Sequence, residues 1–145
     1  MSAAVDAFFE SYRAEYERGD ASAISAHFAF PLHVTSDPGE DGNAEVEVVL
    51  AHVASRDEWV SQINRLLAAY TKIGVGSARI AEQATHKLSP RLFQAVLRWE
   101  LHDAHGDLLY HFDAAYTLAA IDGSLRITAL AHNEQPKLLA LLAHQ

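Results

Sequence analysis

Residues 92–134 read LFQAVLRWELHDAHGDLLYHFDAAYTLAAIDGSLRITALAHNE and contain the clearest structural pattern of the chain. Apolar and polar side chains alternate along most of this stretch, as they do in strands that bury only one face. The alternation is interrupted at His105-Gly106-Asp107 and at Asp122-Gly123, which are turn sequences short enough to join antiparallel neighbours. The stretch therefore predicts three antiparallel strands, namely Leu92–His102, Leu108–Ile121 and Leu125–Glu134.

The two faces of these predicted strands differ in composition. One face carries the larger apolar side chains, and we expect it to contact helices. It comprises Phe93, Ala95, Leu97, Trp99, Leu101, Phe112, Ala114, Tyr116, Leu118, Ile127, Ala129 and Ala131, with Asn133 at its end. The other face mixes charged, polar and small residues. Because it does not have the composition of a solvated charged surface, we expect a second subunit to cover part of it in a homodimer.

Two helices are expected before the first strand. Apolar residues of the first helix recur at helical spacing up to Gly19, and they are Val5, Phe8, Phe9, Tyr12 and Tyr16. Asp20 is a favourable cap for a short second helix, which carries Ile24, His27 and Phe28. That helix must stop before Pro31, because the residue before a proline disfavours helical geometry.

The middle of the chain predicts a hairpin and a long helix. Pro31–Ser36 and Glu45–Val53 are expected to be extended and to be joined by the turn-rich residues 36–43. Ser55 and Glu58 have the spacing of a capping box, so a long helix begins there, and Gly74 ends it.

A further strand and a closing helix complete the expected elements. Val75–Leu88 alternates like the later strands and is followed by the turn residues Ser89-Pro90, while a short helix begins near Pro136. The pattern as a whole is α+β, with helices first and a meandering antiparallel sheet last.

Composition limits the function classes. A length of 145 residues suits one domain spanning positions 1–145. A formal net charge of −8 has the wrong sign for binding nucleic acid or an anionic membrane. The absence of cysteine excludes disulfides and thiolate metal sites. With no leader-like N-terminus and no apolar run of ~20 residues, we expect a cytoplasmic protein.

Two stretches of the chain carry a family resemblance. They are Tyr12-Arg13-Ala14-Glu15-Tyr16-Glu17-Arg18-Gly19-Asp20, followed by Ile24 and Phe28, and Tyr116-Thr117-Leu118 … Asp122-Gly123-Ser124-Leu125-Arg126-Ile127. Both resemble the nuclear transport factor 2-like superfamily, which includes ketosteroid isomerase, scytalone dehydratase and polyketide cyclases of the SnoaL type. The resemblance implies a curved antiparallel sheet wrapped around N-terminal helices as a cone-shaped α+β barrel, with a short C-terminal helix. Many members are dimers, and the open end of the cone holds an apolar ligand.

The ketosteroid isomerase branch supplies two catalytic candidates. Counted from Gly19-Asp20, Tyr12 takes the position of the family's tyrosine that donates a hydrogen bond to a developing enolate. Asp37 precedes a proline as the family's general base does, although the same count places Ser36 at the base position. Asp37 is alternatively the first residue of a Pro-Gly turn.

The second oxyanion acid of that branch has no counterpart on the expected inner face. The corresponding strand offers Ala114 and Tyr116 there instead. Asp113 has the outer parity, where we expect it to pair with Arg98.

Histidine is abundant, with nine residues. Their spacing contains no HExxH motif, and His86, His102, His111 and His132 fall mostly on the outer face, which favours a half-exposed or interfacial role. The chain also lacks the glycine-rich loops that bind phosphates. We therefore predict no metal and no cofactor.

Aromatic residues from several elements are expected to line the cone. The candidate ligand-binding residues are Tyr16, Phe28, Phe30, Trp59, Ile63, Tyr70, Trp99, Tyr116 and Asn133. Such a wall suits a small hydrophobic molecule, unless the rings close on one another and leave no cavity.

Two functions follow, and the sequence leaves open whether the chain is an enzyme. The first is a small apolar-ligand-binding domain. Any catalysis in it would be cofactor-free acid–base work of the isomerase, cyclase or dehydratase kind, with Tyr12 as donor and Asp37 as base. The second is a non-catalytic dimerisation or partner-binding domain of the same fold.

Overall fold

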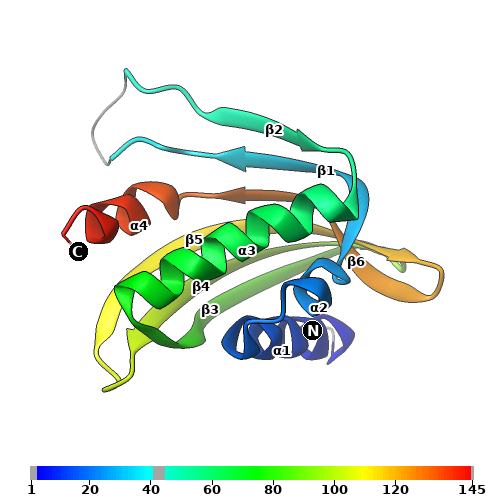
Figure 1. Cartoon of the computed structure of the whole chain (residues 1–145). Coiled ribbons are helices and arrows are strands. Elements are labelled where there is room, and N and C mark those ends of the chain that lie inside the picture. The colour runs from blue at the N-terminus through cyan, green and yellow to red at the C-terminus, as the bar shows by residue number, and fades with distance from the viewer. Residues whose placement is uncertain (1–2, 41–44, 145) are drawn as a thin grey trace.

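The computed structural model describes residues 3–40 and 45–144, which form one six-stranded sheet and four helices (Figure 1). The strands are β1 (Phe28–Ser36), β2 (Val49–Val53), β3 (Val75–Ser89), β4 (Leu92–Asp103), β5 (Leu108–Ile121) and β6 (Ser124–His132). The helices are α1 (Ala3–Arg18), α2 (Ala21–Ser25), α3 (Arg56–Ile73) and α4 (Gln135–Leu142). The strand order is β2-β1-β6-β5-β4-β3. The α+β class predicted from the sequence is confirmed.

Neighbouring strands are antiparallel except for β1 and β6, which run parallel. β2 and β3 are the two edges, so the curved sheet stays open. β1 begins at Phe28, earlier than expected, because Phe28 pairs with Ile127 of β6 and the Ile127 N–H donates to the His27 carbonyl at 2.8 Å. α2 correspondingly ends at Ser25. The last residues of the predicted 36–43 turn lie outside the described residues.

Helix ends follow the local sequence signals. The Asp20 side chain accepts a hydrogen bond from the Ala23 N–H at 3.1 Å and caps α2. Ser55 caps α3 by accepting from the Glu58 N–H at 3.3 Å, as the capping box predicts. α3 ends at Gly74, whose φ of 85° lies in the left-handed region that glycine adopts without strain.

Curvature of the sheet comes from extra residues in its strands. The pairing of β3 with β4 shifts register at three places along its length. β6 carries one extra residue, Thr128, because Leu118 pairs with Ile127 whereas Thr117 pairs with Ala129. Such bulges bend and twist a strand, and one extra residue sends the following side chains to the opposite face. The bent sheet curls around α3 (Figure 1).

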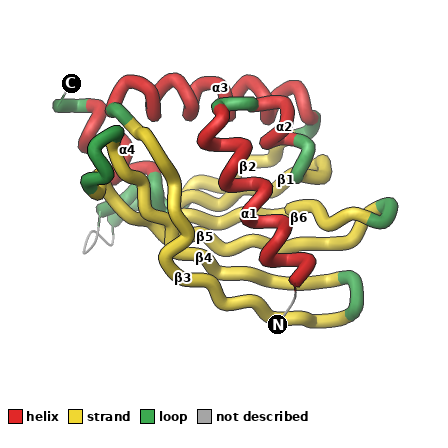
Figure 2. Tube along the Cα trace, turned by 90° about the horizontal axis from the view of Figure 1, so that it is seen from below, coloured by secondary structure: helices red, strands yellow, loops and turns green. Residues whose placement is uncertain are grey.

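The core lies between the concave face of the sheet and the helices. Its largest fully buried side chains include Phe9, Ile24, Phe28 and Leu97. α1 runs crosswise to α3 (Figure 2), and Phe9 contacts Tyr116 of β5 with ring centroids 5.0 Å apart. Burying each such side chain contributes roughly 1.5–3 kcal/mol.

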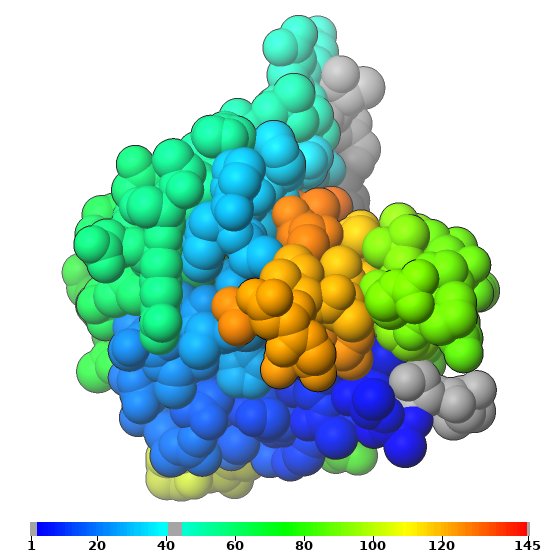
Figure 3. All heavy atoms as spheres, turned by 90° about the vertical axis from the view of Figure 1, so that its right-hand side faces the viewer, coloured from blue at the N-terminus to red at the C-terminus, as the bar shows by residue number. Residues whose placement is uncertain are grey.

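Two of the turns between strands lie at one end of the molecule (Figure 3). The β3–β4 and β5–β6 turns lie beside one another there, above α1 (Figure 3), and the Ala120 N–H donates to the Arg91 carbonyl at 3.0 Å. On the outer face of the sheet, Arg98 and Asp113 form an ion pair with a 2.9 Å contact, as the sequence predicts. Within the described ranges, no helix combines the length and apolar character needed to cross a membrane.

Candidate functional site

A cavity of about 650 Å³ is bounded by the concave face of the sheet and by α1, α3 and α4. Seven of the side chains that the sequence placed in a pocket are part of its wall, namely Tyr12, Tyr16, Trp59, Ile63, Tyr70, Trp99 and Tyr116. Exposed residues such as Arg18, Gln62 and Gly76 form part of its rim. The aromatic rings therefore leave an unfilled space rather than closing on one another.

Glu134 places a buried carboxyl group in this wall. Its residue is 7% exposed and lies between the end of β6 and the start of α4. Its Oε2 accepts a hydrogen bond from the Tyr70 hydroxyl at 2.5 Å and another from the Tyr110 hydroxyl at 2.7 Å. Both hydroxyls therefore lie within hydrogen-bond distance of the same carboxyl oxygen. α3, β5 and the β6–α4 junction thus meet at one carboxyl.

Burial and hydrogen bonding act on this carboxyl in opposite directions. Burial raises the pKa of Glu134, while the two tyrosine hydroxyls and the charge of Lys137 partly counteract that rise. Burial also raises the pKa of Tyr70 and Tyr110, and the nearby Glu134 charge raises it further. Both phenols therefore keep their protons near neutral pH and can donate to Glu134.

His132 adds a second titratable group to the wall. Its Nδ1 accepts a hydrogen bond from the Glu134 backbone N–H at 3.2 Å, so the neutral ring carries its proton on Nε2. Burial lowers the pKa of His132, which favours this neutral form. Ser36 of β1 is its register partner and also lines the cavity.

The remaining polar groups of the aromatic wall bond mainly to one another. The Tyr12 and Tyr16 hydroxyls are 3.2 Å apart, and Trp99 Nε1–H donates to the Tyr116 hydroxyl at 2.9 Å. Trp59 Nε1–H is buried and has no hydrogen-bond partner among the described residues. In the same residues, no group of three or more His, Asp or Glu side chains is arranged to hold a metal ion.

Two of the predicted site residues lie outside the cavity wall for reasons of local geometry. Asp37 is exposed, and its Oδ1 accepts from the Gly39 N–H at 3.0 Å, which is the turn alternative of the sequence analysis. Ser36 faces the cavity instead, because successive strand residues point to opposite faces. Asn133 lies on the other face, where its Oδ1 accepts from the Asp113 N–H at 2.9 Å.

Phe28 and Phe30 are also absent from the wall. Phe28 is fully buried, with its ring centroid 5.2 Å from that of Trp59, and Phe30 packs at the margin of the core. Phe28 therefore packs against Trp59 without lining the cavity itself.

Three wall or near-wall residues were missed by the sequence reasoning, namely Tyr110, His132 and Glu134. Tyr110 has the same parity as Phe112 and could have been included on that ground. The sequence analysis places His132 on the outer face because it continues the alternation unbroken from Ile127, and it assigns no role to Glu134. The bulge at Thr128 reverses the parity, so Leu130, His132 and Glu134 line the cavity.

Comparison with known proteins places this geometry in a family. The model of a family described as NTF2-like protein (DUF6841) matches residues 2–135. No curated protein matches the chain. An NTF-2 like protein of unknown function from Shewanella oneidensis MR-1 has a TM-score of 0.66 at 15% identity, covering 89% of this chain and 95% of that chain.

Two further solved structures have the same fold. An NTF2-like protein with a cystatin-like fold from Novosphingobium aromaticivorans gives a TM-score of 0.66 at 13% identity, covering 96% of this chain and 86% of that chain. A protein of unknown function with a cystatin-like fold from Nostoc punctiforme gives 0.68 at 8% identity, covering 92% of each chain. At these identities the likeness concerns the fold alone. The resemblance found in the sequence is confirmed, and the chain belongs to the family of NTF2-like proteins described as DUF6841.

Proposed function

We propose that this chain binds a small, largely apolar molecule in the cavity and holds one polar group of that molecule at Glu134. The volume of about 650 Å³ falls within the ~300–1,000 Å³ common for small-molecule sites. Aromatic rings would supply the apolar contact area, and a few polar groups would set the orientation. The observation that carries the proposal is a buried carboxyl, held by two tyrosines, in the wall of a cavity of this size.

Titration with an uncharged apolar dye tests this proposal. N-phenyl-1-naphthylamine should bind with increased fluorescence. Ala114→Phe should weaken binding, because Ala114 is buried in the cavity wall and the larger ring would occupy the space. Ala68→Phe is the matched control, because Ala68 of α3 is exposed and is not part of the cavity wall. The proposal fails if the wild type binds no dye, or if both folded variants bind it equally well.

Cofactor-free acid–base catalysis is a second candidate function, favoured by the presence of two titratable side chains, Glu134 and His132, in one cavity wall. Glu134 would take the role of base that the sequence assigned to Asp37, since burial raises its pKa and a base works best near the operating pH. The His132 Nε2–H and the Tyr12 hydroxyl are donors available to stabilise a developing negative charge.

Solvent deuterium exchange tests this second candidate. 2-Tetralone is a suitable probe, because its acidic C–H beside the carbonyl exchanges measurably by NMR. The wild type should accelerate exchange, Glu134→Gln should abolish the acceleration, and Asp37→Asn should retain it. Exchange that is no faster than buffer, or unchanged in Glu134→Gln, excludes this chemistry for the probe class.

We also propose that the outer face of the sheet joins two copies of the chain. The centre of that face carries the small residues Ala115, Thr117 and Ala131 beside the exposed Val96. Light scattering at high micromolar concentration should give a dimer mass, and Val96→Arg should give a monomer. Leu50→Arg, which changes an exposed apolar residue of the edge strand β2, should leave the mass unchanged. A monomer mass for the wild type rejects the interface.

A further inference from the structure

Glu134 has one carboxylate oxygen that faces the cavity. The Tyr70 and Tyr110 hydroxyls both donate to Oε2, whereas Oε1 has no hydrogen-bond partner within residues 3–40 and 45–144. In that same part of the chain, Trp59 Nε1 is the one side-chain polar atom that is both inaccessible to solvent and without a hydrogen-bond partner. Because Oε1 also has no partner, it must be accessible to solvent. Glu134 lines the cavity, so this oxygen borders it.

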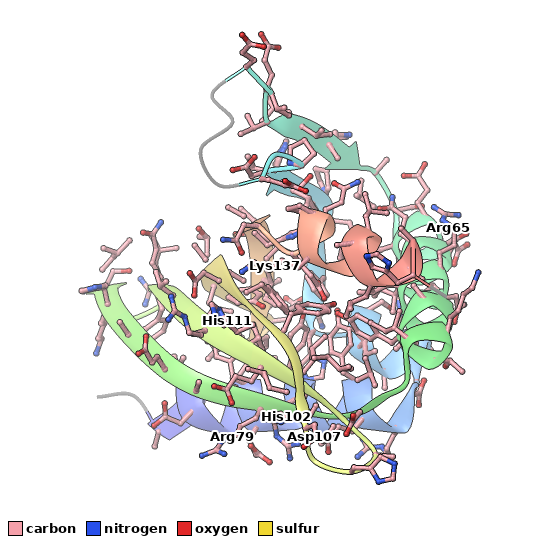
Figure 4. All side chains as sticks on the ribbon, turned by 90° about the vertical axis from the view of Figure 1, so that its left-hand side faces the viewer. Arg65, Arg79, His102, Asp107, His111 and Lys137 are labelled. Carbon is pink, nitrogen blue, oxygen red and sulfur yellow. The ribbon has the colours of Figure 1, made fainter. Side chains whose placement is uncertain are left out.

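Positive side chains near the cavity are engaged elsewhere. Lys137 of α4 donates from Nζ to the His111 backbone carbonyl at 2.5 Å (Figure 4). Arg18 at the rim is ion-paired with Glu15 of its own helix. Among the described residues, no cation lies within ion-pair distance of the Glu134 carboxylate. Buried carboxylates in proteins are normally paired with a positive charge, whereas the Glu134 carboxylate has no such partner among the described residues.

The cavity that Glu134 lines also has aromatic rings in its wall. Tyr16, Tyr70 and Tyr116 line the cavity, as do Trp59 and Trp99. Burial raises the pKa of Tyr16 and Tyr116, and the Glu134 charge raises it further. The faces of aromatic rings carry a negative potential that attracts cations, most strongly at tryptophan and tyrosine.

We propose that the polar group recognised in this cavity is a protonated amine on an apolar body. The ammonium bonds to Glu134 Oε1 and lies against the surrounding aromatic faces. A carboxylic acid ligand is disfavoured, because it would bring a second negative charge to Glu134. A metal ion is disfavoured too, because the described residues offer no cluster of three ligands. This inference rests on the proposed function, and it names the class of molecule that the same cavity takes.

Proton balance does not depend on the state in which the amine arrives. A charged amine pairs directly with the carboxylate. An uncharged amine that meets protonated Glu134 takes the proton from the carboxyl oxygen onto its nitrogen, and the same ion pair results. The two tyrosine donors on Oε2 stabilise the carboxylate in both cases.

Matched pairs of amine and alcohol test the proposal by isothermal titration calorimetry at low salt. Suitable pairs are tryptamine with tryptophol, 2-phenylethylamine with 2-phenylethanol, and 1-adamantanemethylamine with 1-adamantanemethanol. In each pair that binds, the amine should bind at least about tenfold more tightly, or ~1.4 kcal/mol. Glu134→Gln should remove this preference and leave the alcohol affinity unchanged. Glu17→Gln, which neutralises a carboxylate of the rim, should keep the preference.

The outcomes separate this inference from the proposed function. If alcohols bind and no amine binds more tightly than its alcohol, the amine proposal is wrong while the binding cavity stands. If neither class binds and the apolar dye also fails, both are wrong. A preference for the amine over its alcohol that persists in Glu134→Gln, or that disappears in Glu17→Gln, arises from the rim of the cavity. Either result overturns the proposal. If Glu134→Gln does not fold, a wild-type protein that shows no preference for the amine still overturns the proposal, and so does loss of the preference in Glu17→Gln.

Discussion

Removing the Tyr70 hydroxyl measures how far the buried Glu134 is ionised in the folded protein. Tyr70→Phe keeps the ring and deletes the donor that lies 2.5 Å from Oε2. A hydrogen bond to a charged group contributes about 1.5–3 kcal/mol, and one between neutral groups about 0.5–1.5 kcal/mol. The loss of unfolding free energy should therefore be ~1.5–3 kcal/mol where Glu134 is ionised and ~0.5–1.5 kcal/mol where it is protonated.

The direction of the pH dependence follows from the raised pKa of Glu134. Because burial raises that pKa above the unfolded value of about 4.3, the folded state holds its proton more tightly than the unfolded state. Stability from this group is fully present below the unfolded pKa and is lost as the pH rises through the folded pKa. Deleting a donor to the carboxylate raises the folded pKa further, so the deficit of Tyr70→Phe should grow with pH.

Urea unfolding followed by tryptophan fluorescence at several values between pH 5 and pH 8 measures this deficit. Tyr16→Phe is the matched control, because its hydroxyl bonds to another neutral hydroxyl, that of Tyr12, at 3.2 Å. Its deficit should stay near 0.5–1.5 kcal/mol, in the range of neutral hydrogen bonds, and should vary little with pH. A deficit of Tyr70→Phe that is already ~1.5–3 kcal/mol at pH 5 and stays constant to pH 8, or one that shrinks as the pH rises, would refute the reasoning.

Three further perturbations have defined outcomes. Glu134→Gln should gain stability relative to wild type as the pH rises from 5 to 8, at up to ~1.4 kcal/mol per pH unit, because an amide avoids the cost of ionising a buried carboxyl. Urea unfolding measures this gain. A gain that is already complete at pH 4.5 contradicts the prediction. Phe28→Ala should lose about 3–5 kcal/mol, as large-to-small core substitutions do, and a change below ~1 kcal/mol by the same assay would place Phe28 outside the core. Asp37→Ala should leave dye affinity unchanged, because Asp37 is exposed in its turn, and a weakened titration would return it to the site.

Local signals in the sequence predicted most of the fold. Asp20 and Ser55 indicate the starts of α2 and α3, because their side chains accept hydrogen bonds from backbone N–H groups that have no acceptor within the helix. Gly74 indicates the end of α3. Those interactions involve residues only a few positions apart, so one sequence is enough to read them. The early start of β1 could not be read in this way, because it depends on pairing with β6, far along the chain.

The candidate site was predictable only in its aromatic part. Tyr12 and Trp99 are large aromatic residues on the apolar faces of a regular helix and a regular strand, so the sequence pattern identifies them. Both line the cavity. The position of Glu134 depends on a single extra residue at Thr128, which the alternation of side chains along β6 does not reveal. Parity arguments assume unbroken strands, and strongly curved sheets are where that assumption fails.

The parallel pairing of β1 with β6 has a consequence for the order of folding. β1 lies between β2, its neighbour in sequence, and β6, which is near the end of the chain. During synthesis, β1 can pair with β2 early. It can pair with β6 only after most of the chain has been made. Contacts between distant segments are slow to form, so we expect the join between β1 and β6 to be a late step. Glu134 follows β6 directly, so the cavity would acquire its carboxyl only when folding is nearly complete.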